Sequence, residues 1–144
     1  MVPGTELPPL ALTISAAANE RYWRAAGVRH PTLEAGALYP PIAANLTVLC
    51  FARVCADPVI QTRQVVRCHG RADAGVELVT AGTVTARYEK RGRTYIDIAT
   101  TVTIDGELLW ESEVSFTPAA TLERSDREAG PSGPSPKATG AETL

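Results

Sequence analysis

Residues 42–56 form a stretch of chain that is apolar on nearly every side. Only three of its residues are polar, namely Asn45, Thr47 and Arg53. Pro41 suits the first position of a helix and Pro58 disfavours helix in the residue before it, so the pattern predicts one helix over residues 42–56. Such a helix is stable in water only when other structure covers it, and this one is too short to span a bilayer. The rest of the chain must therefore wrap around it.

The second half of the chain alternates apolar and polar residues with a period of two. Three segments carry apolar residues on one parity: Leu78, Val84, Ala86 and Tyr88, then Ile96, Ile98, Val102 and Ile104, then Leu108, Trp110, Val114 and Phe116. This alternation indicates antiparallel strands with one buried face and one solvent-exposed face. Asp105-Gly106 predicts a tight hairpin, Arg91-Gly92 predicts a second turn, and residues 62–69 predict a further strand.

Two shorter elements precede the apolar helix. Residues 10–14 alternate large and small side chains and predict a strand. Ser15 is a good N-cap, residues 16–26 favour helix, and Gly27 suits the end of that helix. The complete pattern predicts an α+β domain in which an antiparallel β-sheet wraps around one long buried α-helix. This arrangement is the hotdog fold.

The length of the chain, 144 residues, suits one domain. We assign that domain to residues 1–118. Residues 119–144 are rich in Ala, Gly, Pro and Ser and contain few large apolar side chains. A segment of this composition cannot bury enough apolar surface to offset the entropy of ordering, so we expect a disordered tail.

Composition also limits the classes of binding partner and the cellular compartments that fit the chain. The formal net charge of −2 argues against nucleic acid, and no apolar run is long enough to cross a membrane. The N-terminus lacks the basic start of a signal peptide. Cys50, Cys55 and Cys68 follow no disulfide or metal-site spacing and fit a reducing cytoplasm. No phosphate-binding glycine loop or dinucleotide fingerprint is present, so we expect neither a metal nor a cofactor.

The order of the predicted elements resembles that of MaoC-like hotdog proteins, a family that includes (R)-specific enoyl-CoA hydratases and 3-hydroxyacyl thioester dehydratases. Local stretches in four places support the resemblance: residues 19–27, 35–38, 81–84 and 88–96. In that family an Asp and a His move protons within a Gly-Asp-x-Asn-Pro-x-His run. The matching run here is residues 27–33, which places Val28 at the Asp position and Leu33 at the His position. Neither side chain can transfer a proton.

Two interpretations of this segment stay open. In the first, His30 serves as the base, because an imidazole titrates near neutral pH. Glu34 and Asn45 are then its companions, and the Gly36 N–H polarises the thioester oxygen. In the second, His30 is a hydrogen-bonded loop residue without a catalytic role.

Arginines on the predicted strands and one turn are candidate contacts for the phosphates of coenzyme A or of a carrier-protein arm. These residues are Arg63, Arg67, Arg91 and Arg93. A solvated sheet face explains the same arginines equally well.

Three functions fit the resemblance, and whether the chain is itself an enzyme stays open. The chain is a hydratase or dehydratase (lyase) subunit that lacks the Asp/His pair and acts beside a catalytic partner on an acyl-CoA or acyl-carrier-protein thioester. Alternatively, it is a self-sufficient dehydratase or thioesterase that uses His30 and Glu34, or a non-enzymatic hotdog that binds acyl thioesters. An open sheet edge predicts a dimer, either with a second copy or with another hotdog subunit.

Overall fold

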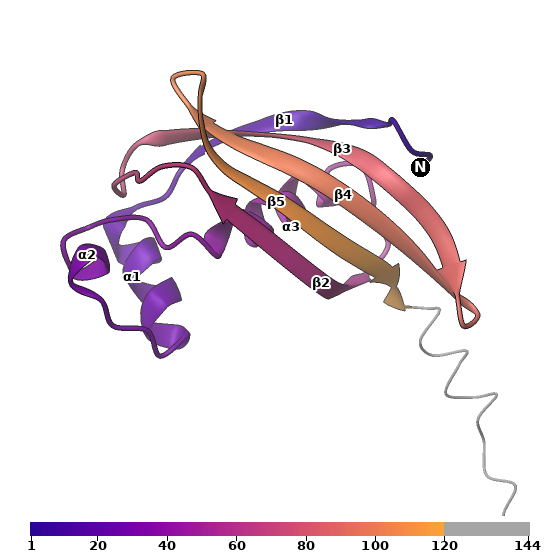
Figure 1. Cartoon of the computed structure of the whole chain (residues 1–144), viewed down its shortest axis with the longest axis horizontal. Helices are drawn as coiled ribbons and strands as arrows, with labels where there is room; N and C mark the ends of the chain where they lie inside the picture. The colour runs from indigo at the N-terminus through magenta and orange to yellow at the C-terminus, as the bar shows by residue number, and fades with distance from the viewer. Residues whose placement is uncertain (120–144) are drawn as a thin grey trace, which may run out of the picture.

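The structure is a computed structural model of the chain, and it describes residues 1–119. The predicted tail therefore lies outside the described residues, except for its first residue. The elements, in chain order, are β1 (Glu6–Thr13), α1 (Ala16–Ala25), α2 (Pro31–Glu34), α3 (Ile42–Ala52), β2 (Val59–Cys68), β3 (Glu77–Lys90), β4 (Arg93–Ile104) and β5 (Glu107–Pro118). The strands form one antiparallel sheet in the order β1-β3-β4-β5-β2, and α3 lies against its inner face (Figure 1). This architecture confirms the predicted hotdog fold.

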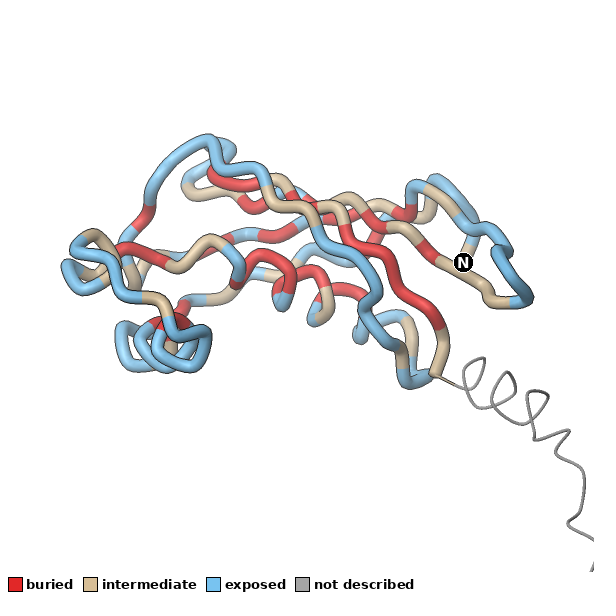
Figure 2. Tube along the Cα trace, turned by 60° about the horizontal axis from the view of Figure 1, so that its bottom comes forward, coloured by how far each residue is buried: buried red, intermediate tan, exposed pale blue. Residues whose placement is uncertain are grey.

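The apolar helix is shorter and less enclosed than its sequence predicts. It ends at Ala52, and the turn that follows is held by the Arg53 side chain, which donates to the carbonyl of Pro9 at 2.7 Å. One side of α3 is buried against the sheet, whereas the opposite side faces outward (Figure 2). Leu49 on that outward side is 49% exposed. The sheet of a single chain therefore leaves one side of the helix uncovered.

The hairpins form where their sequences predict them. Asp105 and Gly106 both have positive φ, at 49° and 85°, which is the backbone of a tight two-residue turn. Arg91 and Gly92 repeat this geometry at the other end of β4. The turns set the register of β3, β4 and β5, and hence the residues that face α3.

Two β-bulges overturn part of the predicted inward parity. A register shift between Val84 and Ala86 turns the rest of β3 over, so that Tyr88 is exposed and stacks on Tyr95. A second shift, near the β4–β5 turn, buries Leu109 and leaves Leu108 exposed. The prediction that Ala86, Tyr88 and Leu108 face inward was therefore wrong, because one extra residue reverses the alternation.

The core between α3 and the sheet has two apolar clusters. The first contains Trp110, Leu78 and Leu46, and the second contains Phe51 and Phe116, whose rings stack with centroids 5.1 Å apart. Between them, four elements each contribute a small polar side chain: Thr47 from α3, Thr80 from β3, Thr100 from β4 and Ser112 from β5. We call these four residues the hydroxyl band.

The hydroxyl band is only partly hydrogen-bonded. The hydroxyls of Thr47 and Thr100 lie 2.7 Å apart, and Thr47 also donates to the carbonyl of Ala43. The hydroxyls of Thr80 and Ser112 have no partner within residues 1–119. Buried polar groups are nearly always hydrogen-bonded, so this part of the core departs from the usual pattern.

The cysteines occupy three different environments. Cys50 is fully buried on the inner side of α3, where burial raises the pKa of its thiol and keeps it protonated at neutral pH. Cys55 is half-buried and Cys68 is exposed on β2. Of the three cysteines, only Cys50 is therefore placed as a small buried apolar residue.

Candidate functional site

The segment between α1 and α3 is held in place by one buried side chain. Asn19 on α1 donates from Nδ2 to the carbonyl of Ala37 at 2.8 Å and accepts from the N–H of Tyr39 at 2.9 Å. Both hydrogen bonds join α1 to the segment that leads into α3, and Asn19 is almost completely buried. Its amide therefore fixes the position of α2 and of the chain leading into α3.

His30 begins α2, a single helical turn that the sequence pattern did not predict. Its Nδ1 accepts a hydrogen bond from the N–H of Thr32 at 3.2 Å, so the imidazole is the N-cap, with Pro31 at the first helical position. An accepting Nδ1 requires the proton of the neutral ring to sit on Nε2. In this arrangement His30 offers a donor from Nε2, whereas a general base would need a free lone pair there.

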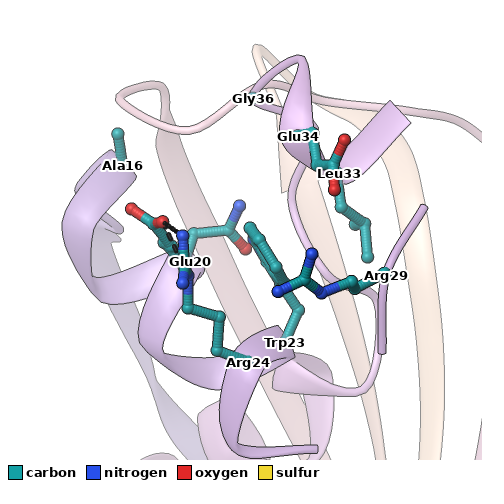
Figure 3. A pocket seen from close by; sticks show the side chains of 9 residues that line it. Ala16, Glu20, Trp23, Arg24, Arg29, Leu33, Glu34 and Gly36 are labelled. Atoms are coloured by element: carbon teal, nitrogen blue, oxygen red, sulfur yellow. Dashed lines mark hydrogen bonds and ion pairs between the residues drawn. The ribbon is translucent and has the colours of Figure 1, made fainter. Parts of the chain in front are cut away.

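Leu33 separates two cavities at this end of the molecule. The apolar cavity, of about 370 Å³, is lined by Val28, His30, Leu33, Tyr39, Arg71 and Trp110 together with smaller residues. The charged cleft, of about 320 Å³, lies between α1 and α2 and is lined by Trp23, Arg24, Arg29, Leu33, Glu34 and Gly36 among others (Figure 3).

The walls of the apolar cavity come from segments far apart in the sequence. Val28 and Leu33 approach from the α1–α3 connection, and Trp110 approaches from β5 of the sheet. The residues that line the cavity include no Asp or Glu. Arg71, its one arginine, pairs with Asp73 at 3.1 Å. The cavity is thus suited to a hydrocarbon chain.

Trp110, which lines the apolar cavity, carries one polar group, the N–H of its indole ring. Trp110 is 1% exposed, and its Nε1–H has no acceptor among the described residues. An unpaired buried donor costs about 1–3 kcal/mol relative to a paired one.

The charged cleft contains paired charges around a buried indole. Arg24 bonds to Glu20 one turn earlier, with Nε and Oε1 2.7 Å apart, and its guanidinium lies 5.3 Å from the Trp23 ring centre. Arg29 points toward Trp23 from the opposite wall, and Glu34 lies above it (Figure 3). The acids and arginines balance, so the cleft as a whole is close to neutral.

The structure separates the residues that one interpretation joins into a catalytic group. His30 lines the apolar cavity, whereas Glu34 and Gly36 line the charged cleft. The Gly36 N–H already donates to the carbonyl of Leu33 at 3.0 Å. Asn45 is exposed on α3 and lines neither cavity.

The four predicted phosphate-binding arginines also lie away from both cavities. Arg91 and Arg93 flank the β3–β4 hairpin, at the opposite end of the sheet from α2 (Figure 1). Arg63 and Arg67 are on β2, where Arg67 pairs with Glu113 of β5 at 2.6 Å. Hydrogen bonding and attraction from Arg67 lower the pKa of the Glu113 carboxyl. These positions fit an exposed sheet surface.

Sequence reasoning missed several residues of the site. Trp23 lines the charged cleft and Trp110 lines the apolar cavity. Arg24 and Arg29 lie within the stretch that carries the resemblance, but nothing in their spacing marks a cleft. Only the inward parity of Trp110 gave a usable signal.

Two structural tests concern metals and membranes. Across residues 1–119, no group of three or more His, Cys, Asp or Glu side chains is placed to hold a metal ion. No helix in this part of the chain has both the length and the apolar character required to cross a bilayer.

Comparisons with known proteins identify the fold. No protein-family model matches the chain, and no curated protein matches its sequence. A chain of the HadBC (3R-hydroxyacyl-ACP dehydratase) complex from Mycobacterium tuberculosis aligns with a TM-score of 0.67 and 20% identity, covering 81% of this chain and 97% of that one. The (R)-hydratase from A. caviae involved in PHA biosynthesis aligns with a TM-score of 0.64 and 16% identity, covering 81% and 96%. This chain has a hotdog fold.

A third hotdog structure agrees with the first two. The MaoC-like dehydratase from Rhodospirillum rubrum aligns with a TM-score of 0.62 and 14% identity, covering 82% of this chain and 92% of that one. At such low identity the likeness establishes the hotdog fold, and the activity has to be argued from the site.

Proposed function

We propose that this chain is a non-catalytic subunit of a hotdog hydratase or dehydratase, which binds the acyl part of a thioester while a second hotdog subunit supplies the proton-transfer groups. One observation supports the proposal: Val28 and Leu33, which the sequence resemblance matches to the family's Asp and His, line the apolar cavity together. The site is shaped for an acyl chain and filled with aliphatic side chains where the reaction needs an acid and a base.

The chemistry of hydration supports separate roles for the two subunits, with acyl binding in this chain and proton transfer in its partner. Adding water to an enoyl thioester requires a base that activates the water and an acid that protonates the α-carbon. No carboxylate lines the apolar cavity, and the imidazole of His30 is used as a helix cap. The cavity of this chain can hold a substrate but offers no pair of groups for these two transfers.

This chain has a sheet edge that suits pairing with a second subunit. β2 forms one edge of the sheet and contains no proline, so its outer backbone groups are open to pairing with another strand. The other edge, β1, contains Pro8 and Pro9 and an irregular register at that point, which disfavours pairing. Leu49 is an exposed apolar residue on the outward side of α3. We propose that a hotdog partner pairs along β2 and covers α3.

Two measurements test the proposed function. The purified chain is expected to bind octanoyl-CoA in calorimetry but to show no hydration of the corresponding enoyl-CoA above background. Co-expression with a hotdog chain encoded beside it that retains the Asp and His should give an active complex. Substantial hydration by this chain alone would refute the proposal.

A pair of variants tests the cavity itself. Val28→Phe fills the apolar cavity and is expected to reduce octanoyl-CoA binding at least about tenfold, a loss of roughly 1.4 kcal/mol. Val79→Phe places the same side chain on the outer face of β3, away from the cavity, and should leave binding unchanged. Equal binding by wild type and both variants would show that the acyl chain is held elsewhere.

A further inference from the structure

The β3–β4 hairpin carries cations that the proposed function does not use. Lys90, Arg91 and Arg93 lie at or beside its turn, in a chain whose formal net charge is −2. The hairpin is at the opposite end of the sheet from α2 (Figure 1). None of these cations lines the apolar cavity or the charged cleft.

Two tyrosines lie next to these cations on the outer face of the sheet. Tyr88 on β3 is paired with Tyr95 on β4, and Lys90 is paired with Arg93 nearer the turn. Ile96, next to Tyr95, is buried in the core, so Tyr95 lies on the outer face. The two rings stack with centroids 5.4 Å apart, and Tyr88 is 40% exposed. Because residues two apart on a strand share a face, the two rings and two of the cations form one block.

A β-bulge places Tyr88 on this face. The register shift between Val84 and Ala86 reverses the alternation of β3, and without it Tyr88 would lie on the inner face with Val84. Bulges often redirect a side chain at a functional position. Glu89, the one acid among residues 86–95, pairs with Thr94 and lies by the same alternation on the opposite face. The outer face beside the turn therefore combines aromatic rings with cations.

This combination of side chains suits a contact with another protein. Tyrosine and arginine are enriched at such contacts, where a tyrosine ring supplies a large area at a low cost in entropy. Guanidinium and ammonium groups bind carboxylates. Asp97 follows on β4 beyond the tyrosines, on the side away from Lys90 and Arg91. The positive charge is thus at the turn, and its complement is an acidic group.

We propose that the outer face of the β3–β4 hairpin is a docking site for an acidic segment of a partner protein. Carboxylates of that segment bind Lys90 and Arg91, and its apolar side chains pack on Tyr88. The site is separate from β2 and α3, where the hotdog partner is proposed to bind. It is also independent of the proposed function, because neither a cavity nor a thioester takes part.

The test measures binding of a fluorescein-labelled peptide to the full chain by fluorescence anisotropy. The peptide consists of glutamates with a pair of leucines, and a control peptide has lysine in place of every glutamate. The glutamate peptide should bind with a Kd below about 1 mM at low salt, and its affinity should fall as salt is added. The lysine peptide should not bind.

Matched variants locate the site on the hairpin. Lys90→Glu should weaken binding of the glutamate peptide at least about tenfold. Arg21→Glu makes the same change of charge at an exposed residue of α1 and should alter the affinity less than about twofold. Tyr88→Thr should weaken binding about threefold or more. Tyr22→Thr changes a tyrosine of α1 that is also 40% exposed and should have no effect.

Several outcomes would refute the docking site. The first is a glutamate peptide that does not bind the wild type, and the second is equal weakening by the hairpin variants and their controls on α1. The third is tighter binding of single-stranded oligothymidine or of phosphatidylserine vesicles than of the glutamate peptide, which would assign the face to nucleic acid or to a membrane. The comparison of peptides uses the wild type alone, so the proposal stays testable if a variant fails to fold. Octanoyl-CoA binding is measured separately, so failure of the docking site leaves the proposed function standing.

Discussion

At the scale of single residues, His30 shows how one side chain can satisfy two different patterns. Its position in the run 27–33 and its imidazole side chain are those expected of a base, but in the structure its Nδ1 caps α2. The cap is a local role that a short polar side chain such as Asn can also perform. The two interpretations of His30 therefore lead to different results on substitution.

We expect His30→Ala to lower the free energy of unfolding by about 0.5–1 kcal/mol, because the helix loses its cap. His30→Asn should retain most of the stability. In the complex with a catalytic partner, both variants should retain hydration activity within about threefold, whereas loss of a general base costs at least about a hundredfold. Denaturant unfolding and steady-state assays of the three proteins measure these effects. A hundredfold loss in both variants would restore His30 as the base.

Gly82 is a second residue whose role follows from its surroundings. A Cβ at this position would lie 2.7 Å from Cγ2 of Thr100 and 3.1 Å from Cδ1 of Leu7. Thr100 cannot easily move aside, because its hydroxyl is bonded to Thr47. The glycine therefore makes room for the hydroxyl band under α3.

Gly82→Ala is expected to destabilise the domain by about 1–3 kcal/mol, the range for overpacking a well-packed core. The double variant Gly82→Ala with Thr100→Ser removes the clashing methyl group but keeps the hydroxyl, so it should recover a large part of the loss. Thermal unfolding of the wild type, both single variants and the double variant gives the coupling between the two sites. If the double variant is no more stable than Gly82→Ala alone, the clash is not the cause.

At the scale of elements, the pairing of β2 with β5 combines backbone bonds with charged side chains. Arg67 and Glu113 are both exposed, and their pairing lowers the pKa of the Glu113 carboxyl from its ordinary value of 4.5. The folded state thus favours the charged carboxylate. Its contribution to stability is present above pH 4.5 and is lost as the pH falls through the lowered pKa.

The wild type should therefore be more stable than Glu113→Gln at neutral pH and low salt, with the difference closing under acid conditions. Melting temperatures measured from pH 7 to about pH 3 test this expectation. Added salt should reduce the difference at neutral pH, since both groups are exposed. A difference that grows as the pH falls would contradict the assigned pKa shift.

The elements also show how far the sequence can predict this structure. Period-two alternation and two glycine turns predicted β3, β4 and β5, because each signal depends on neighbouring residues only. The bulges near Val84 and Leu109 were missed, since no local residue type marks them. The apolar cavity was missed as a unit because it joins Val28 to Trp110, and contacts between distant segments leave no periodic signal.

At the scale of the whole molecule, one side of α3 is left uncovered by the sheet of its own chain. Its sequence predicts a helix covered on all sides, yet its outer side bears Leu49 in solvent. In the proposed assembly, a second hotdog subunit covers this side.

Leu49→Glu should weaken association with the partner at least about tenfold, because it places a charge in the centre of the proposed contact. Val79→Glu adds the same charge at an exposed apolar residue on the outer face of β3 and should leave association unchanged. Sedimentation or light scattering over a concentration series measures both. Equal association by the two variants would place the partner on another surface.

The two prolines of β1 have a consequence for the number of chains in the assembly. When a partner strand pairs along β2, the opposite edge of the sheet is β1, where Pro8 and Pro9 disfavour further pairing. Fibres form when a sheet adds further strands at both of its edges, which requires both edge strands to be free to pair. The sheet therefore grows once and stops, so that raising the concentration of the chain favours the pair and does not lengthen the assembly beyond it.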